Sequence, residues 1–293
     1  FGMISGSAVA NVASVGTITI PLMKRAGFPP ETAAAIEAVG STGGQIAPPV
    51  MGAAAFLMAE YLQVPYATVM VAAVIPALLF YAALFFQVDL ESAKLGIHGA
   101  PRENLPSVGQ ALREGWHFPI PFFVLIGGLL WWNLEAEYAA LLATAVLIGL
   151  AMVVPYKGRR IRPLEALNAV ISAGGAVVDI IAITAVSGIL IGAMNITGVA
   201  FSLTQQIISL SGGSLAMLLL ITAFASFILG LPLPTLGVYV ILATLAAPAL
   251  TQAGISALQA HMFVLFSGIL GMVTPPVALA AFAGATIAQS DQW

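Results

Sequence analysis

Two small sets of polar residues interrupt an otherwise apolar sequence, and their oxygen atoms suit the binding of a hard cation such as Na⁺. The first set offers hydroxyls, an amide and backbone carbonyls, from Ser5, Ser7, Asn11, Gly43, Gly44 and Ala47. The second offers hydroxyls and carbonyls, from Gly230, Thr235, Thr274 and their neighbours. Freed carbonyls and hydroxyls coordinate hard cations, and the N-termini of helices attract anions. We expect two related cation sites; the alternative for any single Ser or Thr is a hydrogen bond within its own helix.

An internal duplication relates the two sets. The stretch STGGQIAPPVMG, residues 41–52, is echoed by GILGMVTPPVAL, residues 268–279, so that Pro48-Pro49 lies 227 residues before Pro275-Pro276. The same offset links Gly27 to Gly254, Pro21 to Pro248 and Gly44 to Gly271. Paired hydrophobic segments broken by Gly and Pro at corresponding positions indicate a transporter's binding site. The alternative, two incidental kinks, does not explain the shared offset.

The composition is that of a membrane protein. Hydrophobic residues make up 60% of the chain and charged residues 7%, whereas a soluble domain carries about 25% charged residues. The 293 residues contain no cysteine and only three histidines, so neither thiol chemistry nor a Cys/His metal site is indicated. An intramembrane enzyme would need paired Asp residues, a Ser/His pair at membrane depth or a zinc motif, and the sequence shows none of these.

We predict an all-α polytopic fold built from two inverted repeats. Residues 1–88 form the first repeat, which holds the tip and second arm of a re-entrant hairpin, a broken helix over 31–62 and a span over 66–88. Residues 89–116 form a polar cytoplasmic connector. Residues 117–293 form the second repeat, with scaffold spans over 117–132 and 138–155, a hairpin over 199–252 and a broken helix over 257–288. The chain begins inside an apolar run, and we expect it to be a piece of a longer protein that supplies the first arm of the first hairpin.

Two details of this layout concern length and charge. The helical pattern over 164–198 is about 50 Å long at 1.5 Å per residue, too long for one crossing. We therefore expect an interfacial arm over 164–179 and a span over 180–198. In this layout all nine Lys and Arg residues fall on one side of the membrane and Glu60, Glu135 and Glu137 on the other, as the positive-inside rule requires.

Glu37 is an acidic residue within the first broken helix. Acidic residues inside membrane segments are functional hypotheses by default, so a proton or cation role is open. The alternative is a carboxylate near the cytoplasmic interface that is bonded to a neighbouring helix.

The segments FGMISGSAVANVASVGTITIPLMKRAGF and GMVTPPVALAAF, with the GLPLPT turn, resemble the large membrane subunit of tripartite ATP-independent periplasmic (TRAP) transporters. The stretch IEAVGSTGGQIAPPVMGAAAFLMAEYL is most similar to the fused permeases that work with TAXI-type binding proteins. The resemblance implies an elevator-type secondary transporter, not an enzyme, in a bacterial or archaeal inner membrane. It implies uptake of an organic acid with Na⁺ symport and without other cofactors. It also implies two partners, an extracytoplasmic binding protein and a small membrane subunit.

The resemblance also implies which residues meet the solute. The family's first hairpin tip corresponds to Ser5, Gly6, Ser7 and Asn11, and its second to the stretch from Gly230 to Pro234 and Thr235. Its first broken helix corresponds to the stretch from Gly43 to Pro48 and Pro49, and its second to the stretch from Met272 to Pro275 and Pro276. Leu231, Pro232 and Leu233 depart from the Gly and Met more common at the second tip, which weakens the expectation of a second cation site.

Other functions remain open at this level. A stand-alone divalent-anion:Na⁺ symporter shares hairpins and broken helices but needs no binding protein. A passive channel is a further alternative, although channels do not require inverted hairpins. The sequence does not specify the solute, the coupling ion, the stoichiometry or the oligomeric state.

Overall fold

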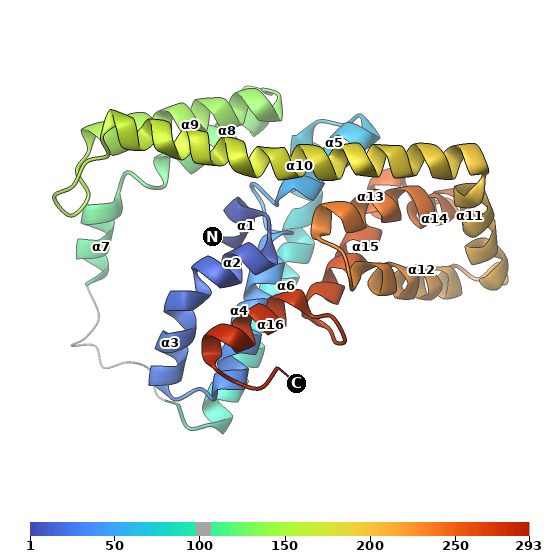
Figure 1. The fold of residues 1–293 in the computed structure, drawn as a ribbon, viewed down its shortest axis with the longest axis horizontal. Helices are drawn as coiled ribbons and strands as arrows, with labels where there is room; N and C mark the ends of the chain where they lie inside the picture. The colour runs from blue at the N-terminus through green and yellow to red at the C-terminus, as the bar shows by residue number, and fades with distance from the viewer. Residues whose placement is uncertain (98–106, 293) are drawn as a thin grey trace. The chain divides into compact units, whose positions relative to one another are not determined.

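The computed structural model describes residues 1–97 and 107–292, and over these ranges it contains helices and no named strand (Figure 1). The chain divides into two compact units, which are described separately below. The first comprises Phe1–Val64, Thr68–His98 and Ile183–Trp293, and the second comprises Pro65–Ala67 and Gly99–Ala182. This architecture confirms the predicted all-α class.

The first repeat forms a short hairpin followed by a broken helix. Its helices are α1 (Gly2–Ser5), α2 (Ala8–Ser14), α3 (Gly16–Ala26), α4 (Pro30–Gly44) and α5 (Ala53–Leu62). Gly6, in the left-handed region at φ 64°, ends α1, and the Ser7 hydroxyl caps α2 by accepting from the Ala10 N–H. After α4 the chain meets two prolines, which cannot continue the hydrogen-bond ladder, and it resumes as α5 after Gly52.

The second repeat has the same order of elements. Its helices are α12 (Leu215–Gly230), α13 (Thr235–Leu245), α14 (Ala247–Gln252), α15 (Ala257–Ile269), the 3₁₀ turn η2 (Leu270–Val273) and α16 (Leu279–Ala288). Ser214 and Ser256 cap α12 and α15 with their hydroxyls. The break after η2 contains Pro275-Pro276 and ends at Ala278, as the break after α4 ends at Gly52.

The 227-residue offset holds for the backbone as well as the sequence. Starting from Pro30, α4 matches α15, which starts at Ala257. The left-handed residues agree: Gly27 matches Gly254, and Met51 matches Ala278. The Pro48-Pro49 and Pro275-Pro276 peptide bonds are both cis. The helix starts and the left-handed residues thus recur at the same 227-residue spacing in the two predicted repeats.

The two repeats interlock within the first unit. The end of the second repeat, α16, packs against α4, α2 and α3 of the first, and α5 contacts α13 and α15. One hydrophobic cluster joins residues of both repeats, namely Ala8, Val12, Ala38, Met272 and Ala280. A second joins Ile20, Ala33 and Ala34 to Ala288. Side chains of the first repeat thus complete the core of the second.

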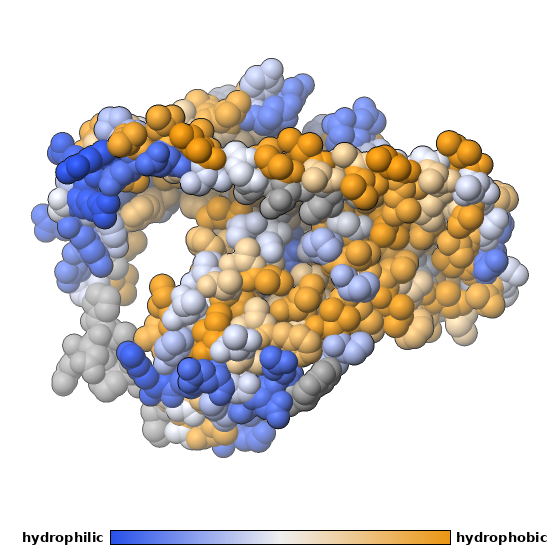
Figure 2. Space-filling view, viewed as in Figure 1, coloured by the Kyte–Doolittle hydropathy of each residue, from blue (hydrophilic) through white to orange (hydrophobic). Residues whose placement is uncertain are grey.

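Several helices are long and apolar enough to cross a membrane. Among the described residues these are α6 (Tyr66–Lys94), α9 (Ala136–Val153) and the pair α13–α14 over Thr235–Gln252. A fourth span results if the segments Thr184–Thr197 and Val199–Leu210, which are bent by 73° relative to each other, are counted as one. Large apolar side chains on α6 are exposed, among them Ile75 and Phe85 at 69% and 68%. Figure 2 shows apolar side chains covering most of the visible helix faces. Such surfaces suit lipid contact.

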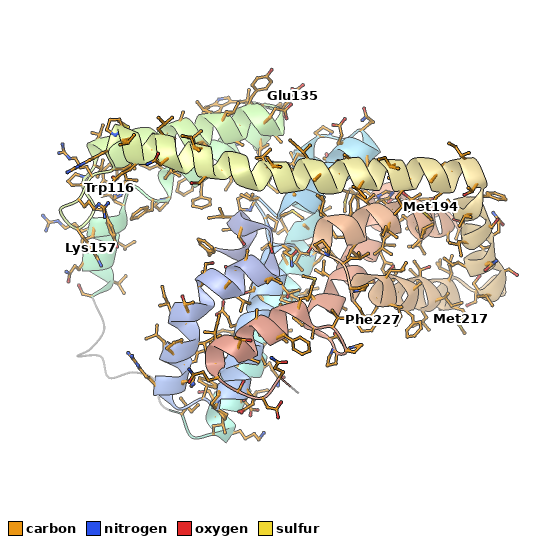
Figure 3. The ribbon with its side chains drawn as sticks, in the orientation of Figure 1. Trp116, Glu135, Lys157, Met194, Met217 and Phe227 are labelled. Carbon is orange, nitrogen blue, oxygen red and sulfur yellow. The ribbon has the colours of Figure 1, made fainter. Side chains whose placement is uncertain are left out.

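The second unit contains α7 (Val108–Gly115), α8 (Ile120–Leu130), α9 and the first part of α10 (Pro163–Thr197). Figure 3 shows Glu135 at one end of α9 and Lys157 and Trp116 at the other. The 18 residues of α9 extend about 27 Å, close to the thickness of a bilayer core. The two ends of α9 thus carry charges of opposite sign, and the side of the membrane on which each lies stays a prediction.

The start of α10 is held by an exposed carboxylate. Glu165 accepts from the backbone N–H of Arg162 and from the Arg159 guanidinium, at 3.0 and 2.7 Å. Both hydrogen bonds lower the pKa of Glu165, and the bond from the Arg162 N–H has the larger effect. The arrangement is that of a capping box, in which a Glu of the first turn closes back on the preceding residue.

Two details of the predicted layout need revision. The helix α10 runs without interruption from Pro163 to Thr197, so the break expected between 179 and 180 is wrong, because no Pro stands there to interrupt the hydrogen-bond ladder. The first scaffold span, expected over 117–132, is helical only over Ile120–Leu130. Part of the predicted connector over 89–116, residues 98–106 with Arg102, lies outside the described residues.

Candidate functional site

The two repeats meet at a hydrogen bond between Gln45 and Thr235. Gln45 follows the last residue of α4, where the first broken helix is interrupted, and Thr235 is the first residue of α13, directly after the second hairpin tip. The Thr235 hydroxyl donates to Gln45 Oε1, across 190 residues of sequence. This junction places the interruption of the first broken helix beside the second hairpin tip.

Gln45 is itself incompletely paired. The residue is 2% exposed, and its Nε2 group has no hydrogen-bond partner among the described residues. A buried amide N–H without an acceptor is unfavourable by about 1–3 kcal/mol. The junction therefore presents a donor that an anionic oxygen would satisfy.

Glycines allow each hairpin to approach its own broken helix. A Cβ atom on Gly44 would lie 2.6 Å from the backbone of Gly2, and one on Gly271 would lie 2.6 Å from the backbone of Gly230. A Cβ atom on Gly6, which is predicted to meet the solute, would likewise lie 2.7 Å from the Cα atom of Gly52. Because no side chain separates these backbones, their carbonyl and N–H groups lie close to the breaks.

The predicted hydroxyl ligands make local hydrogen bonds. Ser5 donates to the carbonyls of Gly2 and Ser7, and the Ser7 hydroxyl caps α2. The Thr274 hydroxyl donates to the Leu270 carbonyl at 2.7 Å within its own turn. Each oxygen keeps a lone pair that a cation could use, so the cation-ligand role of these residues stays a prediction.

The remaining predicted residues shape the backbone at the breaks. Pro234 directly precedes Thr235, while Pro48 and Pro49 follow Gln45 by three and four residues. Pro275 and Pro276 follow Thr274 in the second break. The Met272 side chain is 3% exposed and packs against Ala8 and Val12, so its backbone is the part available to a ligand. The backbones of Gly43 and Ala47 flank Gln45.

Asn11 lies in a different environment from Ser5 and Ser7. Its Nδ2 group donates to the Ser41 hydroxyl at 2.6 Å, and Ser41 donates to Glu37 at 3.2 Å. The first predicted set is therefore divided between the hairpin tip and this interior polar cluster. Sequence reasoning identified Asn11 and Glu37 separately and did not connect them.

Two residues of the site, Gln45 and Ser41, were not singled out from the sequence. Both stand in the stretch STGGQIAPP, and with Glu37 they recur at intervals of four residues, which places all three on one face of the α4 segment. Polar residues repeating every four positions within an apolar helix were the available signal. The overall glycine and proline content of the stretch drew attention to its backbone instead.

Paired hairpins and paired broken helices in an apolar all-α chain are an arrangement also found in secondary transporters built from inverted repeats. The sequence matches the family described as tripartite ATP-independent periplasmic transporter, DctM component, over residues 1–292. The chain belongs to this family, and it is a multi-pass membrane protein.

Two curated relatives cover nearly all of the chain. It is 27% identical over 294 residues to the isethionate TRAP transporter permease protein DctMQ of Oleidesulfovibrio alaskensis, spanning 99% of this chain and 45% of the relative. It is 25% identical over 306 residues to the uncharacterized protein YgiK of Salmonella typhimurium, spanning 98% of this chain and 65% of the relative. The chain thus covers between about half and two thirds of the length of these relatives.

Proposed function

We propose that this chain is the solute-translocating part of a secondary active transporter that imports an organic acid across the inner membrane by Na⁺ symport. An extracytoplasmic binding protein delivers the solute, and a small membrane subunit, fused or separate, completes the assembly. Membership of the DctM family supports this assembly, and the DctMQ name of one relative is that of a TRAP transporter permease. Bound Na⁺ is the only further component the proposal requires.

The observation that carries the proposal is the junction between Gln45 and Thr235. It joins the broken helix of one repeat to the hairpin tip of the other, both at points where the helix ladder is interrupted. In inverted-repeat transporters the solute and ion sites lie at the repeat interface, where interrupted helices turn their ends toward the ligand. The N-terminus of α13, at Thr235, offers unpaired N–H groups and a partial positive charge.

The chemistry of the junction favours an anionic solute. Both the free Nε2 group of Gln45 and the start of α13 are donors, and a carboxylate accepts from such groups in short, strong hydrogen bonds. One relative is named for isethionate, a small organic anion. We infer that the solute of this chain also presents an anionic head to Gln45 and Thr235, next to the cations held at the hairpin tips.

The experiment that tests the proposal is uptake of labelled organic acids by proteoliposomes that contain the full-length parent protein. Uptake is measured with and without the neighbouring binding protein, and with an imposed Na⁺ gradient, a pH gradient or neither. We expect accumulation that needs both the binding protein and the Na⁺ gradient.

Each other outcome contradicts a defined part of the proposal. Uptake driven by Na⁺ without the binding protein indicates a stand-alone symporter. Equilibration without any gradient indicates a channel, and uptake driven by a pH gradient alone removes Na⁺ as the coupling ion.

A further inference from the structure

The first unit contains an interior polar cluster that is separate from the hairpin tips, formed by Asn11, Thr19, Glu37 and Ser41. Asn11 belongs to α2, Thr19 to α3, and Glu37 and Ser41 to successive turns of α4. The Thr19 and Ser41 hydroxyls donate to the two oxygens of the Glu37 carboxylate, at 2.5 and 3.2 Å. The Asn11 amide donates to Ser41 at 2.6 Å. Three helices therefore contribute polar side chains to one connected hydrogen-bond network.

The cluster carries an unsatisfied acceptor. Asn11 is 6% exposed, and its Oδ1 atom has no hydrogen-bond partner among the described residues. The donors of the cluster itself are already used: Asn11 Nδ2 on Ser41, and the two hydroxyls on Glu37. A buried carbonyl oxygen that shares a cluster with a carboxylate and two hydroxyls has enough acceptors around it, and what it lacks is a positively charged partner.

The Glu37 carboxylate also has no ion pair within the described part of the chain. The elements around it carry Lys24, Arg25 and Lys94 as their basic residues. The Lys24 ammonium donates to the Ala288 carbonyl at 2.6 Å, and Lys94 pairs with Glu91 at 3.3 Å. No salt bridge joins Arg25 to Glu37 in this range. The negative charge is thus held by hydroxyl donors alone.

A cavity of about 370 Å³ opens onto these groups and is lined by Asn11, Thr19, Glu37 and Ser41 together with apolar residues of α3, α4 and α6. One water molecule occupies about 30 Å³ in the liquid, so the cavity can admit a partly hydrated ion. Gly16 makes room for the carboxylate, since a Cβ atom there would lie 3.2 Å from Glu37 Cγ. The site is therefore both accessible and built around its acid.

We propose that Asn11 Oδ1, the Glu37 carboxylate and the Thr19 and Ser41 hydroxyls form a Na⁺ site distinct from those at the hairpin tips. The donor set contains only oxygen, which is the preference of hard cations. Its single formal negative charge matches a monovalent ion. If the Thr19 and Ser41 hydroxyls turn their hydrogen atoms away, all four residues can offer an oxygen lone pair to the ion. The cluster has neither the imidazole nor the thiolate ligands that zinc and copper ions prefer.

The position of the site links it to the junction. Glu37, Ser41 and Gln45 follow one another at intervals of four residues on the α4 segment, so the site lies about 12 Å from Gln45 along the helix axis. Ser41 touches the ion and stands one turn before the residue that we propose meets the solute. The link between the ion and the solute rests on the proposed function, whereas the ion site itself does not.

The test is Na⁺-dependent stabilisation of the purified full-length parent. Thermal unfolding midpoints are measured in NaCl and choline chloride mixtures of constant ionic strength, for the wild type, Glu37→Gln and Glu31→Gln. Glu31 is exposed in the first turn of the same helix and serves as the matched control. Because Na⁺ binds the folded state, it raises the midpoint of the wild type. In Glu37→Gln the Na⁺ concentration for half-maximal stabilisation rises by about tenfold or more, as expected for loss of a charged partner.

Two further variants separate ligand loss from misfolding. Glu37→Asp keeps the charge and is expected to retain part of the response, whereas Asn11→Leu removes the amide oxygen and weakens it. Glu37→Gln with an unchanged Na⁺ response overturns the site. If acidification replaces Na⁺ as the stabilising condition, and Glu37→Gln abolishes that effect, the carboxylate binds a proton and the Na⁺ assignment is wrong.

Uptake measured with the same preparations separates this inference from the proposed function. If Na⁺ drives uptake but Glu37→Gln leaves the Na⁺-dependent stabilisation unchanged, the ion site is wrong and the proposed function stands. If Glu37→Gln loses the Na⁺-dependent stabilisation but uptake by the wild type needs no Na⁺ gradient, the ion site is supported and the proposed Na⁺ coupling is wrong.

Discussion

At the scale of single residues, Gln45 is the residue on which the proposed recognition of the solute depends. It is buried, its carbonyl accepts from Thr235, and its amide group is free. Such a residue is poorly explained by packing, because a leucine would fill the space without leaving a polar group unpaired.

We predict that Gln45→Leu raises the solute KM of the full-length parent by about tenfold or more, in line with the loss of one hydrogen bond to a charged group. Gln45→Glu should reduce uptake further, since a carboxylate at this point repels an anion. Gln206→Leu, an exposed position on α11 (Val199–Leu210), is the control and should change neither KM nor maximal rate. Equal KM values in all three variants would remove Gln45 from the solute site.

Sequence reasoning reached the residues of this site unevenly. Thr235 and the prolines were identified because Pro and Gly interruptions stand out in an apolar sequence. Gln45 was missed because its partner lies 190 residues away, and no local pattern reveals a contact at that separation. For the same reason Asn11 was grouped with Ser5 and Ser7, its neighbours in sequence, although its hydrogen bond is to Ser41.

At the scale of the elements, each hairpin lies against its broken helix through glycine. Gly44 and Gly271 occupy equivalent positions in the two repeats, and each faces backbone rather than a flexible side chain. A methyl group at either position must move the backbone of a neighbouring helix, since no side chain there can rotate away.

We predict that Gly44→Ala and Gly271→Ala each destabilise the purified protein by about 1–3 kcal/mol, the usual range for overpacking. Gly149→Ala on α9 is the matched control, because nothing lies within 4 Å of the Cβ it would add. Thermal unfolding with and without Na⁺ provides the measurement. If Gly44→Ala unfolds at the wild-type temperature, the close approach of α1 and α4 is not part of the folded structure.

The elements themselves were largely predictable. The 227-residue offset led to a second broken helix over 257–288, where α15, η2 and α16 are found. The failure at α10 has a physical basis: length alone argued for a break, while the residues around 179 include no proline, and every backbone N–H there can still donate within the helix. The interlocking of α16 with α2, α3 and α4 was not predictable, since nearly every face of these helices is apolar.

At the scale of the whole molecule, we propose that the junction is reached from either side of the membrane in turn. The acidic and basic ends of α9 support a fixed orientation under the positive-inside rule. In transporters built from inverted repeats, the two halves provide two related arrangements of one site. The 293 residues contain no cysteine, which makes this part of the chain suited to single-cysteine labelling.

The most direct measurement is therefore the accessibility of Ala47→Cys in the full-length parent to a membrane-impermeant thiol reagent applied from each side. Ala47 is partly buried and stands between Gln45 and Pro48 at the junction. Lys94→Cys and Glu60→Cys are the controls, each expected to react from one side only and from opposite sides. The account predicts that Ala47→Cys reacts from both sides and that Na⁺ with solute changes the ratio of the two rates. Reaction from a single side under every condition would contradict it.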